Sequence, residues 1–202
     1  MSLDKENLDK LLKEEGEIKG VVFETDRIFV IKKAGEEGLR KVEEKIKELG
    51  YPIDYRNPKT EEWFPVGLRI ISLLVIKEVL GFDDATIREM GRSAPNVSTF
   101  IRFFLHHLFS VKKILDMAPS LWNKHFRNFG EAENIKADEE GRETILRLKG
   151  AKGHPIFHLY LEGYFEKVVS LGIKGKNIKT EETKCIFRGD PYCEYTTHWD
   201  PL

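Results

Sequence analysis

The chain has 202 residues and carries 33 basic against 34 acidic side chains, a formal net charge of −1. This balance argues against a protein held on nucleic acid or on an anionic membrane by bulk charge. Hydrophobic residues make up 41 %, with 13 Phe, which excludes a disordered chain. We expect one domain over residues 16–202, preceded by an N-terminal helix within residues 1–15.

The composition also predicts where the protein works. There is no Gln, only 3 Met and 2 Cys, and 33 % charged residues, which is typical of proteins from hot environments. Two cysteines are too few for a secreted disulfide scaffold, and the first residues lack a basic-then-apolar signal peptide. The apolar stretch over residues 70–76 is too short to span a bilayer. We therefore expect a cytoplasmic protein from a thermophile, without nucleic acid as a partner.

The first two thirds of the chain read mainly as helices. Hydrophobic spacing predicts, in chain order, a helix over residues 4–15, a β-hairpin over 18–31, helices over 35–49 and 60–80, a short helix from Asp83 or Asp84 to Met90, and a helix over 98–117. Gly50, Gly81 and Gly91 are the expected helix stops. Pro119 breaks the last helix, with another turn or two over 121–129.

The last third changes to a strand period. It predicts strands over residues 132–136 and 144–148, a helix over 154–171, and a terminal hairpin of strands over 179–187 and 192–199. The order of hairpin, helices, strands, helix and hairpin predicts an α+β fold. We expect an antiparallel sheet with its helices packed mainly on one side.

Three stretches resemble a known superfamily. The run Glu181-Glu182-Thr183-Lys184-Cys185-Ile186-Phe187-Arg188-Gly189-Asp190-Pro191-Tyr192-Cys193 resembles the signature of the 4-vinyl reductase domain. That family is grouped with the TRAPP vesicle-tethering subunits and, in fold, with the haem nitric-oxide/oxygen-binding (H-NOX) domain. Ile87-Arg88-Glu89-Met90-Gly91-Arg92 with the following Phe-rich helix, and Tyr160-Leu161-Glu162-Gly163, are also similar to these families.

The resemblance implies a dimeric sensory or scaffold module that binds a small apolar molecule between its helices and its sheet. Two predicted helices are rich in aromatic residues, which suit the walls of such a pocket, although stripes of this kind also fill ordinary cores. The predicted ligand-binding residues are Phe100, Phe104, His107, Leu108, Phe157, His158, Tyr160 and Tyr164.

The two cysteines carry the most specific motif. A two-residue turn at Gly189-Asp190 would point Cys185 and Cys193 to opposite faces of the hairpin, whereas a three-residue loop over residues 188–190 would pair them directly. Three interpretations stay open: two packed thiols, a disulfide, or two ligands of a zinc ion. For zinc, the candidate ligands are Cys185, Cys193 and His198, with His154 or His158 as a fourth.

Haem is disfavoured by the sequence. The H-NOX resemblance would require an axial histidine, which falls near His125, and a Tyr-x-Ser-x-Arg clamp for the propionates. Residues 147–151 stand where the clamp belongs, and they read Arg-Leu-Lys-Gly-Ala.

The chain shows no phosphate-binding loop, nucleophile elbow or zinc-protease motif, so an enzyme is the less favoured class. A ligand-binding sensory module is the favoured hypothesis. A zinc-binding regulator and a TRAPP-like assembly scaffold are the alternatives.

Overall fold

The structure is a computed structural model that describes residues 4–96 and 110–202. Its N-terminal part comprises α1 (Lys5–Leu11), β1 (Glu17–Lys19), α2 (Val21–Leu49), β2 (Trp63–Pro65), α3 (Val66–Leu80), α4 (Asp84–Ser93) and a 3-10 turn over Ala94–Asn96. Its C-terminal part comprises α6 (Val111–Asp116), α7 (Ala118–His125), β3 (Phe126–Arg127), β4 (Glu131–Asp138), β5 (Glu143–Lys149), α8 (Pro155–Ser170), β6 (Lys176–Lys184) and β7 (Cys193–Asp200).

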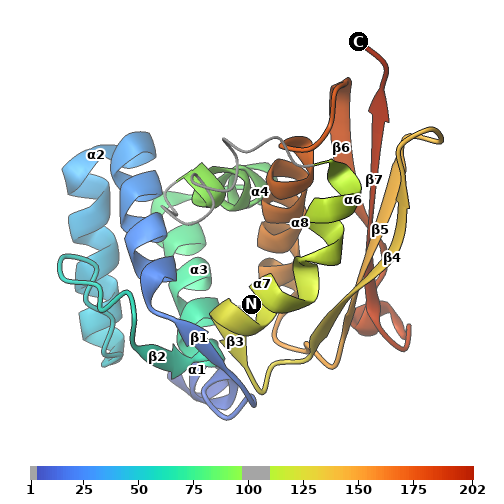
Figure 1. Ribbon diagram of the computed structural model, residues 1–202. Helices are drawn as coiled ribbons and strands as arrows, with labels where there is room; N and C mark the ends of the chain where they lie inside the picture. The colour runs from blue at the N-terminus through green and yellow to red at the C-terminus, as the bar shows by residue number, and fades with distance from the viewer. Residues whose placement is uncertain (1–3, 97–109) are drawn as a thin grey trace.

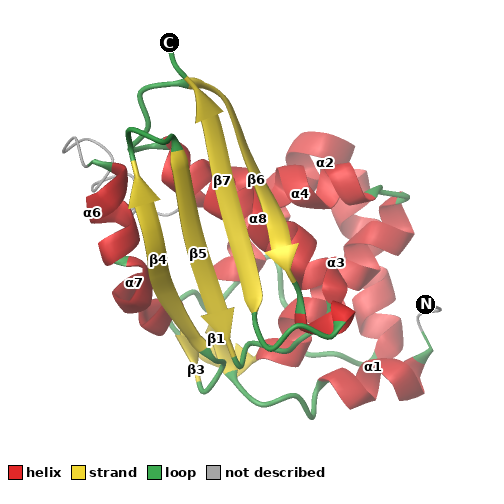
Figure 2. Ribbon diagram, turned by 90° about the vertical axis from the view of Figure 1, so that its right-hand side faces the viewer, coloured by secondary structure: helices red, strands yellow, loops and turns green. Residues whose placement is uncertain are grey.

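A four-stranded antiparallel sheet in the order β4-β5-β7-β6 forms one layer of the molecule. The helices lie on one of its faces, with α8, α6 and α7 next to the sheet and α2 and α3 farther away (Figures 1 and 2). A second, three-stranded sheet in the order β2-β1-β3 brings together strands from both parts of the chain. The predicted α+β architecture, with helices mainly on one side of an antiparallel sheet, is confirmed.

One hydrophobic core runs through both layers. α1 contributes Leu8, which has no exposed surface, and α3 is buried on nearly every side. α8 packs ten buried residues between α4 and the sheet. Among the described residues, no helix is both long enough and apolar enough to cross a membrane.

The predicted β-hairpin over residues 18–31 is wrong. Only Glu17–Lys19 forms a strand, and the rest is the first half of α2. Phe23, Asp26 and Val30 are buried at helical spacing, so packing against α3 overrides the strand preference of the Val and Ile residues. The helix then breaks at Gly35, whose φ of 69° only glycine adopts readily.

Two helix boundaries also differ from the prediction. Residues 63–65 pair with β1, which delays the helix expected from residue 60 until Val66. α4 continues through the predicted stop at Gly91, because that glycine faces the α8 backbone in a tight crossing. The stops at Gly50 and Gly81 are confirmed, since both adopt the left-handed conformation that ends a helix.

The helix break predicted at Pro119 is confirmed, since α6 ends at Asp116 and a separate short helix, α7, follows. Proline is tolerated in the first turn of a helix, and here it occupies the first turn of α7. Of the helix predicted over residues 98–117, the described part is α6, and residues 97–109 lie outside the described part of the chain.

The C-terminal strands agree with the sequence. β4 and β5 cover the predicted strands, and β6 and β7 form the terminal hairpin. Lys184 pairs with Glu194, and this register continued by one residue sets Cys185 opposite Cys193. The connection is longer than the predicted three-residue loop, because a 3-10 turn over Ile186–Arg188 and the left-handed Gly189 precede β7.

Candidate functional site

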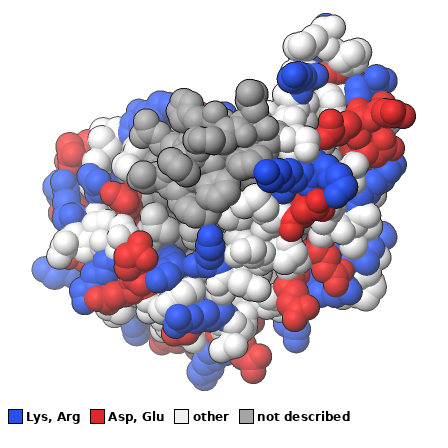
Figure 3. All heavy atoms as spheres, in the orientation of Figure 1, with Lys and Arg blue, Asp and Glu red and all other residues white. Residues whose placement is uncertain are grey.

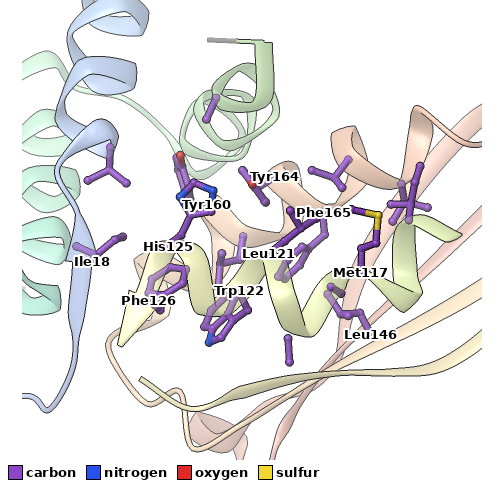
Figure 4. Close-up of a pocket in the computed structure, with 18 of the residues that line it drawn as sticks. Ile18, Met117, Leu121, Trp122, His125, Phe126, Leu146, Tyr160, Tyr164 and Phe165 are labelled. Carbon is purple, nitrogen blue, oxygen red and sulfur yellow. The ribbon is translucent and has the colours of Figure 1, made fainter. Parts of the chain in front are cut away.

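An apolar pocket lies between the helical layer and the sheet. Its volume is about 140 Å³, and its lining comes from β1, α2, α6, α7, α8 and the sheet strands β4 and β5. The side chains of Trp122, Phe126, Leu146 and Phe165 gather around one space, with α7 on one side and α8 on the other (Figure 4). The pocket therefore sits where helices meet sheet.

Helix α8 supplies the inner wall. Phe157, Tyr160, Leu161 and Tyr164 follow helical spacing and face the pocket, and all but Tyr164 are almost fully buried. Of the predicted ligand-binding residues, Phe157, Tyr160 and Tyr164 thus line the pocket, whereas His158 faces away from it. Phe100, Phe104, His107 and Leu108 lie outside the described residues.

The outer wall is α7, which sequence reasoning missed. Trp122 stacks on Phe126 with ring centroids 4.0 Å apart, and its indole N–H donates to the Phe129 carbonyl at 3.1 Å. Leu121 and His125 complete this wall. The four-residue spacing of Trp122 and Phe126 is the sequence signal that places both rings on one side of this segment. From the sequence, residues 121–129 are predicted only as another turn or two of helix.

Few polar groups reach the pocket. They belong to Thr25, His125, Tyr160 and Tyr164. Burial, with Lys124 nearby, lowers the pKa of His125, so its imidazole is neutral at pH 7. Burial raises the pKa of both tyrosines, which therefore remain hydrogen-bond donors.

A second site lies on the other side of α8. His158, Glu182, Cys185 and Cys193 bring one ligand atom each within 4.8 Å of one another. The Nδ1 atom of His158 is 2.7 Å from Glu182 Oε1, 3.5 Å from Cys185 Sγ and 3.8 Å from Cys193 Sγ. Both thiols and the imidazole are buried. We call these four residues the thiol cluster.

The sequence predicted the two cysteines of this cluster and named His158 as an alternative ligand, but it missed Glu182. The structure does not bring the predicted ligand His198 to the thiols. His198 lies five residues farther along β7 than Cys193. Its side chain is 60 % exposed and faces Glu143. His154 is also elsewhere, because its Nδ1 accepts from the Ile156 N–H as the N-cap of α8.

A backbone carbonyl orients the ring of His158. Its Nε2 lies 3.2 Å from the Lys152 carbonyl oxygen, which can only accept, so Nε2 carries a proton. Nδ1 is the atom left to face the two sulfurs and the carboxylate. A backbone carbonyl of this kind is the usual partner of a metal-bound histidine.

The geometry of the thiol cluster fits zinc. Tetrahedral zinc, with Zn–S of about 2.3 Å and Zn–N of about 2.0 Å, sets nitrogen and sulfur ligands about 3.5 Å apart. The two nitrogen–sulfur distances here, 3.5 and 3.8 Å, are close to that value, whereas Glu182 Oε1, 2.7 Å from Nδ1, is hydrogen-bonded directly to the imidazole. Two thiols, one imidazole and one carboxylate are a donor set that zinc accepts.

The charges in the thiol cluster also suit zinc binding. Burial would raise the pKa of Glu182, but the hydrogen bond and charge of His158 hold it below its usual range. Burial raises the pKa of Cys193 to about 12 and also raises that of Cys185. Without a metal, the thiols therefore keep their protons, and metal binding would release them.

Haem does not fit the pocket that the described residues form. His125 lines the pocket, but no Lys or Arg among the described lining residues could pair with propionates. Arg147, at the position expected for the clamp, instead pairs with Glu194 and stacks on Tyr192. The volume suits a single ring rather than four linked pyrroles.

No family model and no curated protein matches the chain. Solved structures do match it. An H-NOX protein from S. oneidensis in the Fe(II)NO ligation state is 14 % identical with a TM-score of 0.67, over 91 % of this chain and 99 % of that one. A mutant of the Fe(II) unliganded H-NOX protein from K. algicida is 11 % identical with a TM-score of 0.63. That match covers 91 % of this chain and 97 % of the other.

These similarities extend over nearly the whole length of both chains, so the fold is H-NOX-like. The structural part of the resemblance deduced from the sequence is thereby confirmed. At this identity the likeness concerns the fold alone.

Proposed function

We propose that this chain is a non-enzymatic sensory module of the 4-vinyl reductase type, which binds a small apolar molecule in the pocket between α7, α8 and the sheet. The observation that carries this proposal is the pocket itself. Its walls are almost entirely apolar side chains, held by elements from both halves of the chain. A concave, apolar site with a few converging polar groups is typical of small-molecule recognition.

The size of the pocket suggests the size of the ligand. An engineered protein cavity of about 150 Å³ lined by apolar side chains binds benzene. The pocket here has about 140 Å³. We therefore expect a ligand of about one ring, or a larger one only if the walls move apart.

A substitution that fills the pocket tests this proposal. Ala132 lines it from β4, so Ala132→Leu should abolish the binding of single-ring compounds, because the added methyl groups occupy their space. Ala137→Leu is the matched control on the same strand, since Ala137 does not line the pocket. Calorimetric titration with toluene measures the loss, which we expect to be at least tenfold for Ala132→Leu and under twofold for Ala137→Leu.

Equal binding by the two variants would contradict the proposal. Native mass spectrometry of the purified protein detects the added mass of any retained ligand. It also counts the subunits, which tests the predicted homodimer. A protein that never carries or binds an apolar compound would favour the TRAPP-like scaffold instead.

The thiol cluster supports a second activity, the binding of zinc. Cys185 and Cys193 belong to the terminal hairpin, whereas His158 belongs to α8. A zinc ion there would join the end of the sheet to the helix that forms the inner wall of the pocket. We propose a structural site, because all four ligands come from the protein and leave no open position.

Removal of one ligand tests the zinc site. Cys185→Ser should reduce bound zinc from one ion per chain to less than a tenth of that and lower the melting temperature, because an alcohol is a poor zinc ligand. His198→Ala is the control, since that histidine lies outside the cluster and should leave the zinc content unchanged. Metal content is measured by plasma emission after dialysis against weak chelator. Full retention of zinc in Cys185→Ser would exclude the site.

A further inference from the structure

A buried ion pair lies directly behind the pocket. Arg69 of α3 and Asp26 of α2 both have no exposed surface, and the Nη1 atom of Arg69 donates to Asp26 Oδ2. Ser72 donates to the same oxygen at 2.6 Å and is hydrogen-bonded to Tyr55 at 2.8 Å. The pair is thus part of a polar network inside an otherwise apolar core.

This network has more donors than acceptors. The Nε and Nη2 atoms of Arg69 have no hydrogen-bond partner among the described residues, and on the acceptor side only Asp26 Oδ1 is similarly unpaired. A buried unsatisfied polar group costs about 1–3 kcal/mol, so such groups are rare unless they serve a purpose. Arg69 is not among the described residues that line the pocket, so this network can act on a ligand there only through a neighbouring side chain.

Two residues connect the network to the pocket. The Arg69 guanidinium lies over the Tyr160 ring at 4.4 Å from its centroid, and Tyr160 lines the pocket. Thr25 precedes Asp26 on α2 and lines the pocket as well. Thr25 donates its own hydroxyl proton to the Val22 carbonyl at 2.8 Å, and the Tyr160 hydroxyl lies within side-chain hydrogen-bonding reach of both Thr25 and Arg69, so it is the polar group through which the network meets the pocket.

We propose that Tyr160, backed by the buried Arg69–Asp26 pair, forms a polar subsite that binds one acceptor oxygen of a neutral, otherwise apolar ligand. This inference rests on the proposed function, because it assigns the ligand class of the same pocket. It adds that the ligand carries a carbonyl or similar oxygen at the end that points toward α2 and α3.

Charge decides between a neutral and an anionic ligand. Asp26 already balances the charge of Arg69, so an anion would bring an uncompensated charge into a dry site. Burial raises the pKa of Tyr160, while the nearby Arg69 charge acts in the opposite direction and strengthens the hydroxyl as a donor. A neutral acceptor gains the hydrogen bond without that charge penalty.

Probes that differ by one oxygen test the subsite. Acetophenone and ethylbenzene have the same ring and two-carbon chain, and only the first has an acceptor. Calorimetric titration gives both dissociation constants for the wild type, for Tyr160→Phe, and for the control Tyr164→Phe, which removes the other tyrosine hydroxyl of the pocket. We expect Tyr160→Phe to weaken acetophenone about tenfold and to leave ethylbenzene within twofold. Tyr164→Phe should leave the ratio of the two probes unchanged.

Each outcome decides the matter. An oxygen-specific loss confined to Tyr160→Phe supports the subsite. Equal changes for both probes, or a loss that follows Tyr164→Phe, overturn the subsite and leave the apolar pocket intact. Benzoate bound more tightly than acetophenone would overturn the neutral-ligand claim. If neither neutral probe binds the wild type, the proposed function fails together with the subsite. Thermal melting confirms that both variants are folded.

Discussion

Arg69 shows how a single buried charge constrains the chain around it. Its guanidinium is fully enclosed, with Asp26 as its counter-ion and Tyr160 beneath it. Taking an ion pair out of water costs several kcal/mol per ion, and the attraction between the ions repays this only in part. The pair is therefore a poor source of stability, yet the loss of either partner alone would be severe.

A double-mutant cycle on this pair tests that reasoning. Arg69→Met should destabilise the fold by about 3–5 kcal/mol, because it leaves the Asp26 carboxylate buried without a counter-ion. The double variant Arg69→Met, Asp26→Leu should recover most of this loss, since it replaces the pair by apolar side chains. Urea unfolding measures both free energies. A double variant as unstable as the single one would mean that packing, and not charge, dominates at this position.

The sequence predicts well those residues whose role depends only on their neighbours along the chain. The helix stops at Gly50 and Gly81 follow from local rules, and so does the cap of α4. The sequence left Asp83 and Asp84 as alternatives for that cap, and the Asp83 side chain accepts from the Thr86 N–H at 2.8 Å. Glu182 could not be recognised in this way. Its role depends on α8, which places His158 beside a strand that is 24 residues farther along the chain.

At the scale of elements, the crossing of α4 and α8 is the most extensive contact between helices in the described chain. Gly91 faces the Tyr160 carbonyl and Gly163 faces the Arg88 carbonyl, so the two backbones touch without side chains between them. Ion pairs flank the crossing: Arg88 binds Glu162, and Arg92 binds Glu166. The same two glutamates accept from backbone N–H groups of β6, which ties the sheet to this pair of helices.

A methyl group at the crossing should force the helices apart. We expect Gly163→Ala to destabilise the fold by about 1–3 kcal/mol, because the new Cβ would overlap the Arg88 carbonyl oxygen. Gly141→Ala is the control, since the nearest atoms to its new Cβ belong to the side chain of Asp138 rather than to backbone. Urea unfolding of the two variants should differ accordingly. Equal stability would show that α4 can shift without loss.

The errors in predicting elements have a common cause. Local signals suggested a hairpin over residues 18–31, but packing turned most of that segment into the first half of α2. α2 is helical because Phe23, Asp26 and Val30 meet α3, a contact that no local pattern displays. Among the strands of the C-terminal third, β5 was predictable because buried residues alternate with more exposed ones along its own length.

For the whole molecule, the sheet, the helical layer and the pocket between them form one unit with an H-NOX-like fold. Lys, Arg, Asp and Glu side chains are interspersed over the face shown in Figure 3. Exposed ion pairs of this kind contribute about 0–1 kcal/mol each. The fold class was predictable from the order of elements, and the family resemblance indicated a pocket between helices and sheet. Its complete lining was not predictable, because the walls come from segments more than a hundred residues apart.

The contrast between the two walls of the pocket has a consequence for how such a protein can diversify. Ten of the sixteen residues of α8 are buried, and they serve the pocket, the α4 crossing and the thiol cluster together. Only one of the eight residues of α7, Trp122, is buried. Changes of ligand preference among descendants should therefore accumulate on α7, where a new side chain alters one surface. On α8, the same change would disturb three structures at once.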